Sequence, residues 1–295
     1  MPLAEVTAPA VQDPRNWLWV ATLVYASGLA IGTFFAKKGQ GIPGLGFLGF
    51  VILGFFLQTR GLYYRGAETH ACPLGNPMEQ IQFIAWSFVV TYLLIRFIFK
   101  LHLLGLFTTG LATALCALSL LSTGLDKPYW QDPAYTRLFT SPWIELHAAV
   151  AVFSYGVFAL LAMVAVMYLV QHQALRRKET SPFLRYLPSI QQLEQSAEKL
   201  LLMGVLFLTF SVVVGAIHFS QDLSGVSPAK LWVTIGVWAV YLTMFVLHRT
   251  GRLYAKRFSQ IAIAAFAFAL VSMGTVNSGK KGKDQPGKED APLNE

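Results

Sequence analysis

Residues 141–169, SPWIELHAAVAVFSYGVFALLAMVAVMYL, determine the fold class of this chain. After the polar start of this stretch, residues 146–169 contain no Asp, Glu, Lys or Arg. A helix crosses the hydrocarbon core of a bilayer with about 20 predominantly apolar residues. The stretch therefore predicts a transmembrane helix over about residues 143–170. It places His147 about one turn inside that helix, at the edge of the hydrocarbon.

The composition extends this prediction to the whole chain, which is 55% hydrophobic and 13% charged, whereas soluble domains carry about 25% charged residues. We predict an all-α integral membrane protein, a polytopic bundle of about eight transmembrane helices within one domain, residues 1–276. The expected spans are residues 17–36, 43–59, 81–99, 102–122, 143–170, 200–219, 230–248 and 258–276, the glycine-rich second span being the weakest match. The mixed-charge, Gly- and Pro-containing segment 277–295 is typical of a disordered tail.

The formal net charge of +8 comes mainly from short basic clusters that flank the apolar spans. This is the distribution of the positive-inside rule and not of a groove for nucleic acid. Leaving the tail aside, twelve Lys and Arg residues fall on one side of the predicted bilayer and six on the other. We therefore expect both termini on the outer face.

The same topology sorts the six histidines by face. We expect His70, His147 and His218 at the outer face, and His102, His172 and His248 at the inner face. Iron ligands lie about 2 Å from the metal, whereas the two faces are roughly 30 Å apart. His147 and His248 therefore cannot share one iron.

Helical spacing places Trp143, Ala151 and Ser154 on the same face as His147. Small side chains beside an imidazole would allow a flat macrocycle to lie against the helix, with an aromatic residue covering its edge. The same spacing is also compatible with an interfacial histidine that hydrogen-bonds a carbonyl group. Glu145 is expected to face away from His147 and to cap the start of the helix.

Three other polar residues near the predicted helix ends have plain structural interpretations. His248, with Tyr241 and Met244 on its membrane-facing side, can interact with the helix dipole at a C-terminus. Arg96 lies one turn from a span end and can extend to the membrane surface. Glu79 follows Asn76-Pro77 and can cap the next helix, although a functional role for it stays equally open.

Several catalytic and binding motifs are missing from the sequence. There is no phosphate-binding G-x-x-x-x-G-K-[ST], no H-E-x-x-H, no C-x-x-C-H and no G-x-S-x-G. These absences argue against a hydrolase or a nucleotide-driven pump. Cys72 lies in a loop and Cys116 within a span, so we predict no disulfide between them.

Four collinear segments resemble the cytochrome c assembly proteins of the CcsA type and their HemX-like relatives. TRGLYYRGAETHACPLGNPMEQIQFIAW is similar to the family's second outer connection, and SPWIELHAAVAVFSYG to its S-P-W-x-x-x-H helix. LEQSAEKLLLMGVLFLTFSVVVGAI and SPAKLWVTIGVWAVYLTMFVLHR resemble two further helices of that family.

The resemblance implies a function in handling haem for cytochrome c. His147 matches the outer haem-ligating histidine, and His248 matches a conserved histidine within the membrane helices. The expected cofactor is haem b, bound non-covalently and transiently. The expected partners are another membrane protein of the assembly complex and an apocytochrome c, in a bacterial inner membrane. Without such a partner we do not expect the chain to be an enzyme.

The chain also departs from the haem-presenting branch of the family. HFSQDLSGVSPAKLW contains no tryptophan before Trp232, and Ser227 stands where the family has an aspartate. SMGTVNSGKKG replaces the segment with a second outer histidine. His218, and after it His70, are the candidates for a second axial ligand.

Three interpretations remain from the sequence. The first is delivery of haem to apocytochrome c. The second is a non-catalytic, HemX-like regulator or scaffold that has lost the haem-presenting loop. A small-molecule transporter is a third, for which more Gly- or Pro-broken helices and mid-membrane polar groups are expected, whereas the second span has the glycines without polar partners.

Overall fold

The computed structural model describes residues 13–38, 44–99, 102–126, 141–178, 187–219 and 228–278. In this part of the chain every regular element is a helix, and eight helices are long and apolar enough to cross a membrane. The predicted fold class is confirmed. The tail predicted for 277–295 lies outside the described residues from residue 279 onward.

The helices cover the eight predicted spans and extend several of them at their polar ends. Their bounds are α1 Pro14–Lys37, α2 Gly44–Thr69, α3 Pro77–Phe99, α4 His102–Leu121, the short 3-10 helix η1 Thr123–Leu125, α6 Pro142–Arg177, α7 Ile190–Phe219, α8 Pro228–Arg249 and α9 Ala255–Ser278.

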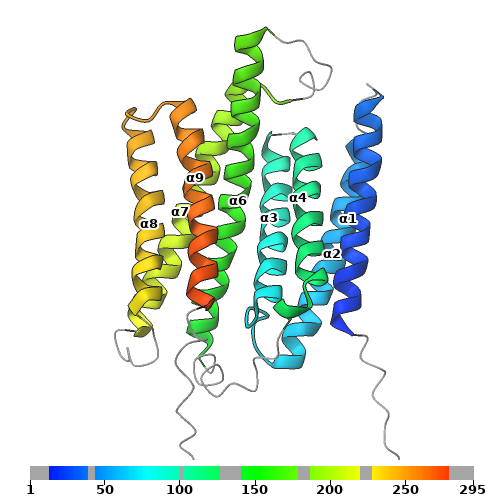
Figure 1. Cartoon of the computed structure of the whole chain (residues 1–295), viewed down its shortest axis with the longest axis vertical. Helices are drawn as coiled ribbons and strands as arrows, with labels where there is room; N and C mark the ends of the chain where they lie inside the picture. Colours follow the sequence, from blue (N-terminus) through cyan, green and yellow to red (C-terminus); the bar gives the residue numbers. More distant parts are fainter. Residues whose placement is uncertain are drawn as a thin grey trace, which may run out of the picture.

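The bundle consists of two groups of four helices that meet along α6 (Figure 1). In the first group, α1 packs against α2 and α4, and α3 packs against α4. In the second group, α6 packs against α7 and α9, and α8 contacts α7 and α9. The contact between α3 and α6 joins the groups. Figure 1 shows that α1 begins and α9 ends at the same end of the bundle. We call this end the terminal end and the other the far end.

Helix α6 is the longest element and extends past its neighbours at the far end (Figure 1). Its 36 residues span about 54 Å at about 1.5 Å per residue, whereas the hydrocarbon core is about 30 Å thick. The last turns, which carry Arg176 and Arg177, therefore reach beyond the hydrocarbon.

A glycine on α6 allows the two helix groups to approach closely. A Cβ atom at Gly156 would lie 2.8 Å from the backbone nitrogen of Phe88 on α3 and would also collide with Ser87. Close helix contact through small residues is a general means of association in membranes, where burial from water gives no driving force. One turn of α6 is thereby fixed against α3.

Buried amides connect the helices of the first group. Gln58 on α2 donates to Oε1 of Gln82 on α3 (3.0 Å) and accepts from Tyr25 on α1 (3.1 Å). Gln82 in turn donates to Ser119 on α4 (2.8 Å). Because unsatisfied polar groups are costly in hydrocarbon, this network specifies how the four helices pack.

A charged cluster ties the same four helices together at the terminal end. Arg65 on α2 donates to Glu79 on α3 (2.7 Å) and to Asp126, which follows η1. Asp126 also accepts from Arg15 on α1 (3.2 Å) and from Asn76 (3.1 Å). The cluster is largely buried, Glu79 being 1% exposed.

The structural interpretations of Glu79 and Arg96 agree with the observed contacts. Asn76 accepts a hydrogen bond from the backbone nitrogen of Glu79 (2.8 Å), and Glu79 accepts one from the backbone nitrogen of Gly75 (2.9 Å). The Asn76 side chain thus caps α3, and Glu79 holds the backbone just before the cap. Arg96, in the last turn of α3, donates to the carbonyl of Gly44 (3.0 Å).

We expect Gly156→Ala to lower the free energy of unfolding by about 1–3 kcal/mol, because the added methyl group must push α3 and α6 apart. Gly236→Ala on α8 is the matched control, since nothing lies within 4 Å of its added Cβ. It should be neutral or stabilise by up to about 1 kcal/mol. Tryptophan-fluorescence melting in detergent measures both, and equal effects would contradict the close α3–α6 contact.

We expect Asp126→Ala to destabilise the chain by about 3 kcal/mol, because it leaves a largely buried guanidinium group with fewer acceptors. Glu198→Ala removes the exposed ion pair with Arg249 and should cost less than about 1 kcal/mol. Thermal unfolding of both variants provides the comparison. A loss at Glu198 as large as that at Asp126 would argue against a structural role for the buried cluster.

Candidate functional site at the terminal end

His147 lies in the second turn of α6, at the terminal end of the bundle, and faces α7. Its Nδ1 atom is 2.7 Å from the carbonyl oxygen of Ser211 on α7. The Ser211 hydroxyl donates to the carbonyl oxygen of His147 (2.9 Å), and its Oγ lies 3.1 Å from Nδ1. The two residues therefore link α6 and α7 in both directions.

Gly215 makes this contact possible. A Cβ atom at this position would lie 2.7 Å from both Nδ1 and Cε1 of His147. In a helix, the amide of residue 215 is bonded to the carbonyl of residue 211, so a side chain at 215 lies beside that carbonyl. With glycine there, the carbonyl of Ser211 can use its second lone pair to accept from the imidazole.

The hydrogen bond to a carbonyl oxygen determines the tautomer of His147. A carbonyl can only accept, so Nδ1 must carry the proton. In the neutral ring Nε2 is then unprotonated, which is the form in which histidine binds a metal ion. Donation from the second ring nitrogen to a backbone carbonyl is the usual outer-shell arrangement of metal-binding histidines.

His218 belongs to the same end of the same interface. It lies in the last turn of α7, three residues after Gly215 and seven after Ser211, and thus on the face that meets His147. The structure therefore brings together the first two histidines expected at the outer face.

The other members of the predicted site differ in their surroundings. Trp143 is 61% exposed at the start of α6, whereas Ser154 is fully buried and donates within α6 to the carbonyl of Ala151 (2.6 Å). The Ser154 hydroxyl is thus satisfied inside its own helix. His70 is exposed and ends α2 in the left-handed conformation, with φ of 50°.

The inner-face histidines lie at the far end. His248, in the last turn of α8, has Nδ1 3.2 Å from the carbonyl oxygen of Leu253 and its ring centroid 4.5 Å from that of Phe258. These contacts hold the connection between α8 and α9. His172 stacks on Tyr168, and the side chain of His102 lies outside the described residues. His147 lies near the start of α6 at the terminal end, whereas His248 lies in the last turn of α8 at the far end (Figure 1). The two histidines are therefore on opposite sides of the bundle.

Glu145 has a neighbour that the sequence did not reveal. Burial raises the pKa of the Cys72 thiol to about 11, and the negative charges of Glu145 and then Glu79 add to this effect. The loop after α2 therefore approaches the start of α6. Glu145 contributes negative potential there, in the first turn of a helix where an acid is favourable.

Within the described ranges, no group of three or more His, Cys, Asp or Glu side chains is arranged to hold a bare metal ion. Haem iron requires only one or two axial protein ligands, because the macrocycle supplies the others. A single oriented imidazole with a carbonyl-bonded Nδ1 satisfies this requirement. The residues around His147 therefore fit haem better than a protein-coordinated ion.

Comparison with known proteins identifies the family of the chain. The model of the cytochrome C assembly protein family matches residues 74–282, which include both His147 and His248. This chain belongs to the cytochrome c assembly protein family.

Relatives within this family carry three different names. Protein HemX of Brevibacillus brevis is 30% identical over 261 residues, 87% of this chain and 94% of the relative. The cytochrome c biogenesis protein CcsA of Cyanidium caldarium is 22% identical over 228 residues, 66% and 75% of the two chains. Protein NrfI of Wolinella succinogenes is 26% identical over 239 residues, 78% of this chain but 24% of that protein.

Sequence reasoning identified His147 but missed Ser211 and Gly215. The available signal was the spacing Ser211-x-x-x-Gly215, a pair of small residues on one helix face. That pattern indicates a close helix contact without naming the partner helix. Only the packing of α7 against α6 shows that the contact holds an imidazole.

The raised pKa of Cys72 predicts slow reaction with maleimides near neutral pH, because only the thiolate reacts. The rate should rise about tenfold for each pH unit from 7.5 to 9.5 without levelling off, whereas an ordinary thiol with pKa of about 8.5 begins to level in this range. Glu145→Gln should increase the rate at fixed pH. A plateau below pH 9, or no effect of Glu145→Gln, would contradict the described surroundings of Cys72.

Proposed function

We propose that this chain is a membrane haem-handling protein of cytochrome c biogenesis. In this proposal it binds haem b transiently through His147 at the outer face of a bacterial inner membrane. It then helps a partner membrane protein deliver the haem to apocytochrome c. The observation that carries the proposal is the orientation of His147, whose Nδ1 lies 2.7 Å from the carbonyl oxygen of Ser211; we infer from it a neutral ring with the proton on Nδ1.

The residues around His147 have separate roles in this proposal. Ser211 and Gly215 orient the imidazole, and the apolar packing of α6 and α7 limits the ways in which it can turn. His218 would be the candidate for a second iron ligand, and Trp143 would cover bound haem at the membrane surface. Bound haem iron would supply the redox chemistry, with a potential set by these ligands and their hydrogen bonds.

The family supports the proposed place in cytochrome c biogenesis, and the basic residues support the orientation. Lys37, Lys38, Arg176, Arg177 and Lys178 lie at helix ends on the far side, the side expected in the cytoplasm. His147 then faces outward together with both termini. Attachment of haem to an apocytochrome would still need the partner, which this chain does not replace.

A second candidate function is that of a non-catalytic, HemX-like regulator or scaffold. It is favoured by the similarity to protein HemX along 87% of the chain. It is also favoured by the sequence of residues 219–231, which contains no tryptophan. In this alternative the α6–α7 contact is purely structural.

Haem binding by purified protein in mild detergent distinguishes the two functions. We expect the wild type to give the absorbance bands of histidine-ligated haem, and His147→Ala to weaken haem affinity by at least about tenfold. Gly215→Ala should also weaken it, because the added methyl group displaces the imidazole. Ser211→Ala should have little effect, because the carbonyl acceptor remains.

His172→Ala at the far end is the control, and His248→Ala tests for a separate site there. No haem binding by the wild type when haem is supplied would favour the scaffold. Unchanged binding in both His147→Ala and His248→Ala would contradict ligation of haem by either of these two histidines.

A further inference from the structure

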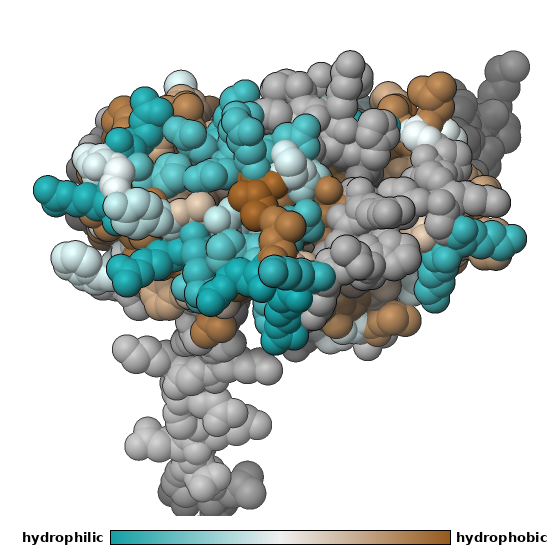
Figure 2. All heavy atoms as spheres, turned by 90° about the horizontal axis from the view of Figure 1, so that it is seen from above, coloured by the Kyte–Doolittle hydropathy of each residue, from teal (hydrophilic) through white to brown (hydrophobic). Residues whose placement is uncertain are grey.

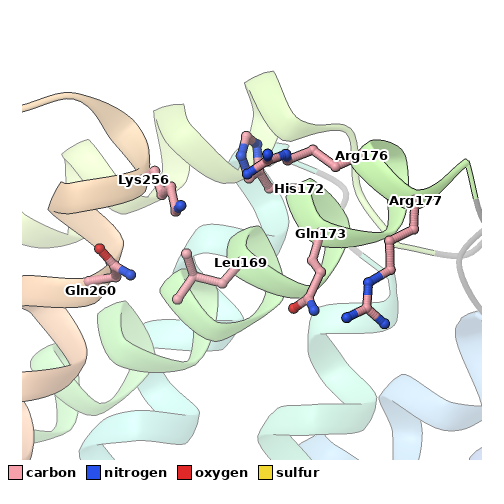
Figure 3. A pocket seen from close by; sticks show the side chains of 7 residues that line it. All are labelled: Leu169, His172, Gln173, Arg176, Arg177, Lys256 and Gln260. Atoms are coloured by element: carbon pink, nitrogen blue, oxygen red, sulfur yellow. The ribbon is translucent and has the colours of Figure 1, made fainter.

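A second polar site lies at the far end, between the protruding part of α6 and the first turns of α9. A cavity of about 540 Å³ is lined by His172, Gln173, Arg176 and Arg177 of α6, Lys256 and Gln260 of α9, and Leu169 beneath them. Figure 3 shows the side chains of Lys256 and Gln260 extending from α9 toward α6, and that of Arg176 extending back toward His172. Two helices thus supply polar groups to one space.

The chemistry of this lining selects for an anion. Lys256, Arg176 and Arg177 carry positive charge, the side-chain amides of Gln173 and Gln260 can donate, and His172 can donate from its ring. Among the residues that the structure describes, no carboxylate lines the cavity. Figure 2, which views this end, shows hydrophilic side chains gathered over α6–α9. A group with several acceptor oxygens, such as a phosphate, matches this donor set.

The depth of the cavity matches the headgroup layer of the bilayer. If about 20 residues of α6 cross the hydrocarbon from His147 onward, the apolar span ends near Val166. Arg176 then lies about 15 Å farther along the helix at about 1.5 Å per residue. Leu169 and His172 fall between these two levels, so the cavity extends from the edge of the hydrocarbon into the headgroups.

Below the cavity the same faces of α6 and α9 are apolar and exposed. Val166 and Val170 are 46% and 44% exposed, and they share a ridge of α6 with Gln173 and Arg177. On α9, Ala264 lies one turn below Gln260 and is also exposed. Donor groups above an exposed apolar strip match a molecule with a phosphate head and acyl chains.

We propose that this cavity binds the phosphodiester headgroup of an anionic phospholipid, with an acyl chain along Val166 and Val170. Basic pockets between transmembrane helices are suited to such headgroups. The strip of apolar surface favours a lipid over a soluble phosphate compound, which would use the donor groups alone. The site is separate from His147, since it lies at the opposite end of α6.

Native mass spectrometry of the full chain in detergent tests the proposal, with phosphatidylglycerol and phosphatidylcholine as probes. We expect phosphatidylglycerol to bind more tightly, and Arg176→Gln/Lys256→Gln to weaken its binding by about tenfold. Arg252→Gln/Arg257→Gln removes the same charge from the same end without altering the cavity lining. This control variant should bind phosphatidylglycerol with an affinity within about twofold of that of the wild type.

Three outcomes would overturn the proposal. Equal losses in the two double variants would show a general surface charge effect. Equal binding of phosphatidylglycerol and phosphatidylcholine would show that the cavity does not select an anionic headgroup. Displacement of the lipid by glycerol 3-phosphate at equal concentration would show a site for a soluble phosphate compound. The Val166→Ser/Val170→Ser variant should weaken phosphatidylglycerol binding, because it removes the apolar contact with the acyl chain. It should leave the affinity for glycerol 3-phosphate unchanged.

Discussion

The hydrogen bond between the His147 imidazole and the Ser211 carbonyl is the constraint from which the proposed chemistry follows. At the edge of hydrocarbon an imidazole N–H needs an acceptor, and a side chain at residue 215 would shield the Ser211 carbonyl from the His147 ring. Gly215 removes that shield and allows α7 to accept from α6. The tautomer of the neutral His147 ring is thereby determined by the backbone of a neighbouring helix.

The two groups of helices use their polar residues differently. In α1–α4, Gln58 and Gln82 bond to one another, and Arg65, Glu79 and Asp126 form a buried charged cluster. These groups satisfy each other and specify packing. In α6–α9 the charged residues and the histidines lie near the helix ends, around His147 at one end and Arg176 at the other. The first group thus supports the second through the α3–α6 contact, while the candidate binding sites lie on α6 and its neighbours.

The sequence was sufficient to predict the helices and the sorting of histidines between the two ends. Apolar length determines both, because a span fixes the positions of its flanking residues. The C-terminal end of α6 was longer than predicted, since residues 171–177 remain helical although most of them are polar. The partners of Arg65 were not predictable, because Asp126 is 61 positions away and meets it only after three helices have packed. Likewise, the spacing Ser211-x-x-x-Gly215 predicts a close helix contact but does not indicate that the His147 imidazole lies beside Gly215.

Imidazole rescue of His147→Gly provides the most direct test that His147 supplies an axial ligand through Nε2. This variant removes the side chain and leaves the Ser211 carbonyl and Gly215 in place. The account predicts that purified His147→Gly loses the spectrum of histidine-ligated haem and that added imidazole restores it, whereas the spectrum of the wild type is unchanged by the same addition. Full haem ligation in His147→Gly without imidazole would contradict the assignment, as would a loss that imidazole does not reverse.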